Sequence, residues 1–181
     1  MPVLKRADAR YCSGRCRTAA HRARKVLPAE MTSKRRWVRR TARKMPLTTS
    51  GRAASSTDAR TWATHAAAKR STVGEGLGYV LADDGIVCVD LDHCLDRSGR
   101  LADWARKILD LMPATFTEVS PSGTGLHIFG RGRVERGRRI RSGGRSIEVY
   151  GCGRYIAVTG DRFETAPTRL ADISAAVATF T

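Results

Sequence analysis

Residues 86–92 read Ile-Val-Cys-Val-Asp-Leu-Asp, a hydrophobic run that ends in two acids one residue apart. Side chains alternate between the two faces of a β-strand, so Asp90 and Asp92 should share one face while Val89 and Leu91 share the other. Two neighbouring carboxylates repel each other unless a cation lies between them, and hard divalent ions prefer carboxylate oxygens. The stretch therefore predicts a strand that presents a metal site. The alternative is a strand end capped by solvated acids.

Two later segments extend this pattern. Residues 117–129 read Thr-Glu-Val-Ser-Pro-Ser-Gly-Thr-Gly-Leu-His-Ile-Phe, a glycine-rich turn that enters a strand containing His127. Residues 145–160 read Arg-Ser-Ile-Glu-Val-Tyr-Gly-Cys-Gly-Arg-Tyr-Ile-Ala-Val-Thr-Gly, with an isolated acid at Glu148. Both residues stand between apolar neighbours, so the alternation places each of them on the face opposite the core.

The order of these three motifs over residues 36–165 resembles the archaeo-eukaryotic primase superfamily, and most closely the primase-polymerase (Prim-Pol) domain of phages and plasmids. The resemblance implies an α+β fold with an RRM-like antiparallel catalytic sheet and flanking helices, preceded here by a basic arm. It implies that Asp90, Asp92 and Glu148 are catalytic ligands of Mg²⁺ or Mn²⁺, although family members often carry aspartate at the position of Glu148. It also implies that His127 binds the triphosphate of the incoming nucleotide.

Further candidates for nucleotide binding lie inside the same motifs. Glycines allow backbone N–H groups to approach a phosphate, and hydroxyls add donors. On these grounds Ser122 and Gly125 are candidates, and Arg145 and Arg154 are candidates because they lie within the motifs that carry the resemblance.

Positive charge is concentrated in the first 72 residues. The net charge is +16, and residues 1–72 hold 19 Lys and Arg against 3 Asp and Glu, whereas residues 73–181 hold 14 of each. A basic segment of this density is typical of a polyanion-binding arm, because neutralising phosphates releases counterions. We expect a basic arm with a linker over residues 1–35 and a Prim-Pol catalytic domain over residues 36–181.

Residues 8–25 of this arm resemble the second half of a small zinc ribbon. Cys12 and Cys16 are candidate Zn²⁺ ligands, but structural zinc takes four ligands and His21 is the only other local candidate. The alternative is a basic helix over about residues 15–26 that lies on nucleic acid or stays solvated.

The remaining chain has an α+β order, for which we expect an antiparallel sheet with helices to one side. An Asp83-Asp84-Gly85 turn predicts a hairpin between the first two strands. Strands are predicted near residues 76–81, 86–91, 115–120, 126–130, 146–150 and 154–159, and helices near residues 59–69, 101–112 and 169–179.

Residues 131–145 contain seven arginines and one acid among several glycines. We expect a mobile loop that clamps the template or the triphosphate, with a solvated loop as the alternative. The candidate nucleic-acid-binding residues are Arg138, Arg139 and Arg141, together with Lys44 from the basic half.

The resemblance implies a template-dependent nucleotidyltransferase that makes primers or extends DNA in phage or plasmid replication by a two-metal mechanism. Its partners would be a single-stranded DNA template, NTPs or dNTPs and a separate replicative helicase, because the sequence has no GxxxxGK[ST] motif. The absence of a long apolar run or a signal peptide predicts a cytoplasmic protein with no membrane partner.

Two alternatives stay open. One is a catalytically inactive, single-stranded nucleic-acid-binding remnant of a primase. The other is a metal-dependent phosphotransferase such as a haloacid-dehalogenase-type phosphatase, because a hydrophobic strand ending in D-x-D also marks that family.

Overall fold

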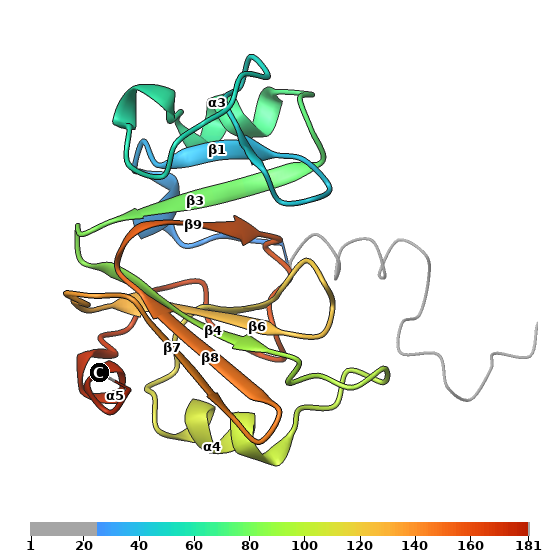
Figure 1. The fold of residues 1–181 in the computed structure, drawn as a ribbon, viewed down its shortest axis with the longest axis vertical. Helices are drawn as coiled ribbons and strands as arrows, with labels where there is room; N and C mark the ends of the chain where they lie inside the picture. The colour runs from blue at the N-terminus through green and yellow to red at the C-terminus, as the bar shows by residue number, and fades with distance from the viewer. Residues whose placement is uncertain (1–24, 181) are drawn as a thin grey trace, which may run out of the picture.

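The fold consists of two antiparallel β-sheets with short helices on their outer surfaces (Figure 1). The structure is a computed structural model that describes residues 25–180, so Cys12, Cys16 and the predicted basic helix lie outside the described residues. The four-stranded sheet has the order β2 (Pro46–Leu47), β1 (Trp37–Arg40), β3 (Gly76–Ala82) and β9 (Cys152–Val158). The five-stranded sheet has the order β5 (Thr117–Val119), β6 (Leu126–Arg131), β4 (Ile86–Asp92), β8 (Arg145–Tyr150) and β7 (Arg138–Ser142).

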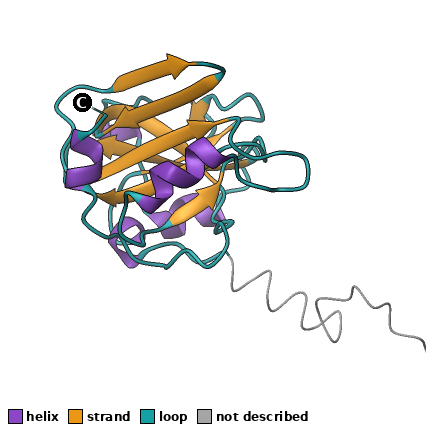
Figure 2. Cartoon of the chain, turned by 90° about the horizontal axis from the view of Figure 1, so that it is seen from below, coloured by secondary structure: helices purple, strands orange, loops and turns teal. Residues whose placement is uncertain are grey.

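The described helices are short. They are α2 (Ala29–Thr32), the 3₁₀ helix η1 (Ala59–Thr61), α3 (His65–Arg70), α4 (Asp103–Asp110) and α5 (Ser174–Ala178). Figure 2 shows helices lying across the strands rather than between them. The antiparallel sheets and flanking helices confirm the α+β class. Within residues 25–180, no helix has the length and apolar character needed to cross a membrane.

Strand β4 is central to the fold because the side chains on each of its faces pack in a different hydrophobic core. Val87, Val89 and Leu91 pack in one core with residues of α4 and α5. Ile86 and Cys88 lie on the opposite face and pack in a second core with residues of the four-stranded sheet. The two sheets therefore pack together over the first half of β4, and the same face carries Asp90 and Asp92 further along.

The predicted hairpin between residues 76–81 and 86–91 is wrong. Strand β3 pairs with β1 and β9, whereas β4 pairs with β6 and β8. Asp83 and Gly85 do form a tight turn with positive φ values of 53° and 85°. The turn passes the chain from one sheet to the other, because each strand buries its apolar face against partners that are distant in sequence.

The helix predicted over residues 59–69 is interrupted. The Trp62 indole donates to the Ser55 carbonyl at 2.7 Å, and the Ala63 N–H donates to the Trp37 carbonyl at 2.7 Å. These contacts to distant backbone end η1, and Thr64 then caps α3 through a hydrogen bond from the Ala67 N–H.

Three other segments differ from their predictions. The C-terminal helix is limited to α5, because Ala171 and Ile173 make backbone hydrogen bonds to Arg131. The arginine-rich segment predicted as a loop contains β7, an edge strand that pairs with β8. Residues 28–35, which belong to the segment expected to be an arm and linker, contain α2, whose Met31 is fully buried and accepts a hydrogen bond from the Trp37 indole. The packed unit thus includes chain before residue 36.

Candidate active site

The candidate site is a row of polar side chains that crosses all strands of the five-stranded sheet. The register pairs Glu118 of β5 with His127 of β6, and His127 with Asp90 of β4. It then pairs Asp90 with Glu148 of β8, and Glu148 with Arg139 of β7. Directly opposed residues on neighbouring strands have their side chains in contact distance on one face. Period-two alternation in each strand thus brings the predicted Asp90, His127 and Glu148 together.

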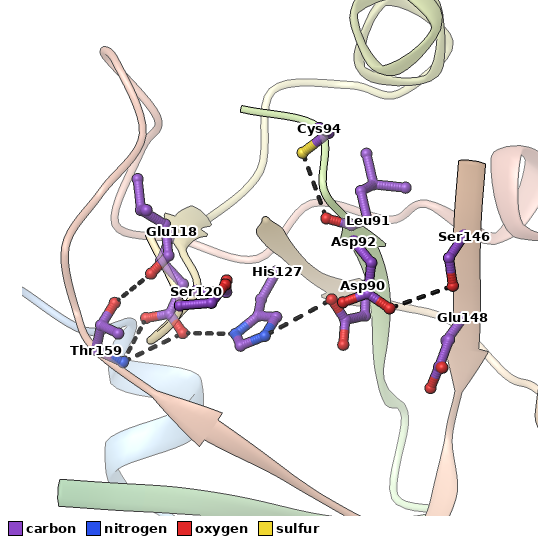
Figure 3. Close-up of polar contacts among 12 residues, drawn as sticks. Asp90, Leu91, Asp92, Cys94, Glu118, Ser120, His127, Ser146, Glu148 and Thr159 are labelled. Atoms are coloured by element: carbon purple, nitrogen blue, oxygen red, sulfur yellow. Dashed lines mark hydrogen bonds and ion pairs between the residues drawn. The ribbon is translucent and has the colours of Figure 1, made fainter. Parts of the chain in front are cut away.

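Asp90 lies at the centre of this row and is largely buried, with 20% of its side chain exposed. Its Oδ1 atom has no hydrogen-bond partner among the described residues and lies 3.7 Å from His127 Nε2. Burial raises the pKa of the Asp90 carboxyl; nearby His127 opposes this effect, and the charges of Asp92 and Glu148 add to it. A bound cation would stabilise the charged form of an acid in this position. Asp92 lies two residues along the strand and accepts a hydrogen bond from Ser146 Oγ at 3.2 Å (Figure 3).

His127 is fixed by a buried carboxylate that the sequence did not single out (Figure 3). Glu118 is fully buried, and its Oε1 lies 3.0 Å from His127 Nδ1. Glu118 also accepts hydrogen bonds from the backbone N–H groups of Thr159 and Gly160, the latter at 2.7 Å. Burial works against a charged His127, but the Glu118 hydrogen bond and the charge of Asp90 outweigh it and raise the pKa of the imidazole above its usual value.

Glu148 is surrounded by partners. Its side chain is buried beside Asp90, and both of its oxygens are engaged. Arg139 forms an ion pair with Oε1, the Tyr150 hydroxyl donates to Oε2 at 2.7 Å, and the Arg154 guanidinium lies 3.4 Å from Oε2. Arg154 also lies over the Tyr150 ring at 4.8 Å. Glu148 therefore holds two arginines next to the acids.

These side chains open into a cleft of about 780 Å³ between the two sheets, which we call the inter-sheet cleft. Asp90, Asp92 and His127 line one wall, and Lys44 and Arg154 are among the residues that come from the four-stranded sheet and its loops. The volume is within the usual range for small-molecule sites. The acids lie on one wall of the cleft, and basic side chains surround them. This arrangement suits a metal-bound polyphosphate, because carboxylates bind the metal ion and cations bind the phosphates.

The other predicted residues lie elsewhere. Ser122 and Gly125 belong to the loop between β5 and β6 and do not line the inter-sheet cleft. A Cβ on Gly125 would lie 2.8 Å from the Leu91 carbonyl oxygen, so close packing against β4 explains this glycine. Arg141 and Arg145 line a separate hollow that also includes Asp92. Arg138 pairs with Val149, whose side chain belongs to the core on the opposite face.

Asp90 and Asp92 have the oxygen donors that Mg²⁺ or Mn²⁺ prefers, and the buried Oδ1 of Asp90 has no hydrogen-bond partner among residues 25–180. Within residues 25–180, no group of three or more His, Cys, Asp or Glu side chains is already arranged as a metal shell. Magnesium commonly keeps several waters and one or two carboxylates, so this pair suits such an ion. Cys88 and Cys94 are buried free thiols, and Cys152 is an exposed one.

Comparison with known proteins shows the family of this chain. The sequence matches the family described as "Bifunctional DNA primase/polymerase, N-terminal" over residues 17–178. A DNA primase-polymerase of Nitratiruptor phage NrS-1 is 38% identical over 122 residues, which are 63% of this chain and 17% of that protein. The chain therefore spans a small part of that relative. Since the family match covers nearly the whole chain, this protein belongs to the bifunctional DNA primase/polymerase N-terminal family.

Proposed function

We propose that this domain is a template-dependent nucleotidyltransferase that extends or initiates DNA or RNA strands on single-stranded DNA. The observation that supports this most is the Asp90 carboxylate, which lines a cleft with arginine and lysine side chains and whose buried Oδ1 has no hydrogen-bond partner in the described part of the chain. The family and the phage relative support the same reaction class. The five-stranded antiparallel sheet would correspond to the RRM-like catalytic sheet of the primase fold.

In the proposed reaction, the oxygen of a strand's 3′ hydroxyl bonds to the α-phosphorus of a nucleoside triphosphate, pyrophosphate leaves, and the hydroxyl proton passes to water. Asp90 and Asp92 would hold one or two Mg²⁺ or Mn²⁺ ions, which supply charge neutralisation for in-line displacement. Glu148 would act as the third carboxylate on release from its arginine partners.

The chain's own cations would position the triphosphate. His127 is held by Glu118 at one ring nitrogen, and its other ring nitrogen faces Asp90. In its protonated form, the imidazole would donate a hydrogen bond to a phosphate oxygen in the cleft. Lys44 and Arg154 line the same cleft from the facing sheet. Charge-assisted bonds from these groups would orient the α-phosphate toward the acids.

The test is incorporation of labelled nucleotide on primed and unprimed single-stranded templates with Mg²⁺ or Mn²⁺. We expect Asp90→Asn and Asp92→Asn each to lower the rate by more than about a hundredfold, because charge stabilisation of the transition state is lost. Asp110→Asn, an exposed acid on α4, is the matched control and should keep the wild-type rate. Products on unprimed template would show initiation as well as extension.

The nucleic-acid-binding alternative makes the opposite prediction. A chain that binds single-stranded DNA but incorporates no nucleotide with either ion, and whose two aspartate variants bind DNA as the wild type does, would be a binding module. That result would overturn the catalytic proposal.

A further inference from the structure

A second hollow shares Asp92 with the inter-sheet cleft. Its volume is about 490 Å³, and we call it the hairpin hollow because most of its lining comes from the turn end of the β7–β8 hairpin. Arg141, Gly143, Gly144 and Arg145 form one side, and Ser146 lies beside Asp92. The register explains the placement of Arg141, because Asp92 pairs with Ser146 and Ser146 pairs with Arg141. Arg145 pairs with Ser142 where the hairpin turns, and it lines the hollow from there.

The arginines of the hairpin hollow differ from those of the inter-sheet cleft. Arg139 and Arg154 are paired with Glu148. By contrast, Arg141 and Arg145 form no ion pair with any residue of the described range 25–180. Exposed guanidinium groups without a protein anion attract a phosphate, because the bound phosphate neutralises their charge.

The backbone around the hollow allows close approach of a ligand. Gly143 and Gly144 have positive φ values of 55° and 78°, and a Cβ at either position would have no atom within 4 Å. His93 also borders the hollow and has a φ of 54°, a left-handed conformation that is uncommon for a residue with a side chain. This turn ends β4 and leaves the space beside Asp92 open.

Strand extension requires two substrates to meet at the same acids. The proposed site for the incoming triphosphate is the inter-sheet cleft, and Asp92 is the residue that lines both hollows. We infer that the hairpin hollow binds the 3′-terminal end of the primer strand, with Arg141 and Arg145 holding the last internucleotide phosphate. This inference rests on the proposed function, and it names the binding site of the second substrate.

The test is a double-mutant cycle between protein and primer. Binding of a labelled primed template is measured by fluorescence anisotropy, for wild type and for Arg141→Ala/Arg145→Ala. Each protein is tested with a normal primer and with a primer whose last internucleotide linkage is an uncharged methylphosphonate. If the two arginines hold that phosphate, either change alone weakens binding about tenfold, and the two together weaken it little more than one.

Two controls address the position and the charge. Arg138→Ala removes one charge from the same strand, but Arg138 does not line the hairpin hollow, so it should leave the effect of the methylphosphonate unchanged. A methylphosphonate in the template strand opposite the primer terminus should weaken binding of wild type and variant by the same factor. The logarithmic salt dependence of binding should fall by about one unit in the double arginine variant.

The inference is overturned if the two changes weaken binding by independent, multiplied factors, or if the double variant is sensitive to the primer substitution and insensitive to the template substitution. These binding results do not depend on turnover. A wild-type protein that shows the coupled effect but incorporates no nucleotide would refute the proposed reaction while leaving the primer site in place.

Discussion

At the scale of single residues, the site is a row of ionisable side chains, and each of them lies beside another on the neighbouring strand. Glu118 lies beside His127, His127 beside Asp90, and Glu148 beside Arg139. Between β4 and β8, two acids adjoin, Asp90 and Glu148. Like charges directly opposite each other across a strand pair are destabilising. A bound cation would therefore stabilise the site most between these two carboxylates.

The buried pair of Glu118 and His127 leads to a first prediction. Glu118→Gln keeps the side-chain volume but removes the charge that holds the His127 ring. We expect the KM for the incoming nucleotide to rise by about tenfold to a hundredfold, the range for loss of such a supporting partner, with a smaller change in kcat. Steady-state incorporation kinetics measure both constants.

A thermal melt separates this role from a purely structural one. Glu118 also accepts backbone hydrogen bonds from Thr159 and Gly160, so its replacement costs some stability. If the lost activity merely follows the unfolded fraction at the assay temperature, Glu118 does not position His127. Glu164→Gln changes an exposed acid and serves as the control for both measurements.

Glu148 leads to a second prediction, about metal affinity. Arg139 and a divalent ion would compete for the same carboxylate oxygens if Glu148 is a metal ligand. Arg139→Ala should then bind Mn²⁺ more tightly than wild type, and Glu148→Gln should bind it more weakly. Titration of Mn²⁺ by electron paramagnetic resonance reports the free ion directly. Equal affinities in all three proteins would mean that Glu148 anchors arginines and binds no metal.

At the scale of elements, the local sequence pattern predicts which face of a strand each side chain occupies. It does not predict which strands pair with each other. The faces of Asp90, His127 and Glu148 follow from period two within each strand, and the register brings these three side chains together as that alternation requires. The division of β3 and β4 between two sheets could not be predicted, because the partners β9 and β8 come from distant parts of the chain.

Two further misses have similar causes. The composition of β7 favours a loop, because its four-residue stretch from Arg138 contains three arginines, but its backbone pairing with β8 outweighs that composition. The sequence marks Glu118 only as part of a motif and gives it no role. Its partner Gly160 lies 42 residues away, so no local signal marks the contact between them.

The loop between β5 and β6 leads to a third prediction. Gly125→Ala should lower the free energy of unfolding by roughly 1–3 kcal/mol, the usual cost of overpacking, because its Cβ would meet the Leu91 carbonyl and Ser120 Oγ. Ser122→Ala, in the same loop, should stay close to wild type. Denaturant titrations measure both. A stable Gly125→Ala variant with a raised nucleotide KM would instead support phosphate binding by this loop.

At the scale of the whole molecule, the uneven charge predicts how the protein holds nucleic acid. Replacing Arg15, Arg17, Arg22 and Arg24 by Gln should weaken binding of single-stranded DNA. The logarithmic salt slope should also fall, by up to about 0.7 for each phosphate that the protein no longer neutralises. The KM for the nucleotide should not change, since the proposed triphosphate ligands His127, Lys44 and Arg154 are all retained. Binding titrations at several salt concentrations provide the slope.

The matched control removes exposed positive charge from the balanced half, with Arg97→Gln and Lys107→Gln. If these two substitutions lower the slope as much per residue as the four in the basic segment, the affinity comes from overall charge and not from an arm.

Each strand of the five-stranded sheet contributes one member of the row from Glu118 to Arg139. A slip of any strand by one residue would turn its member to the opposite face. Enzymatic turnover would therefore report that five separate strands had formed in the right alignment. In a library of randomised core residues, selection for nucleotide incorporation would also discard misaligned sheets, without a separate screen for folding.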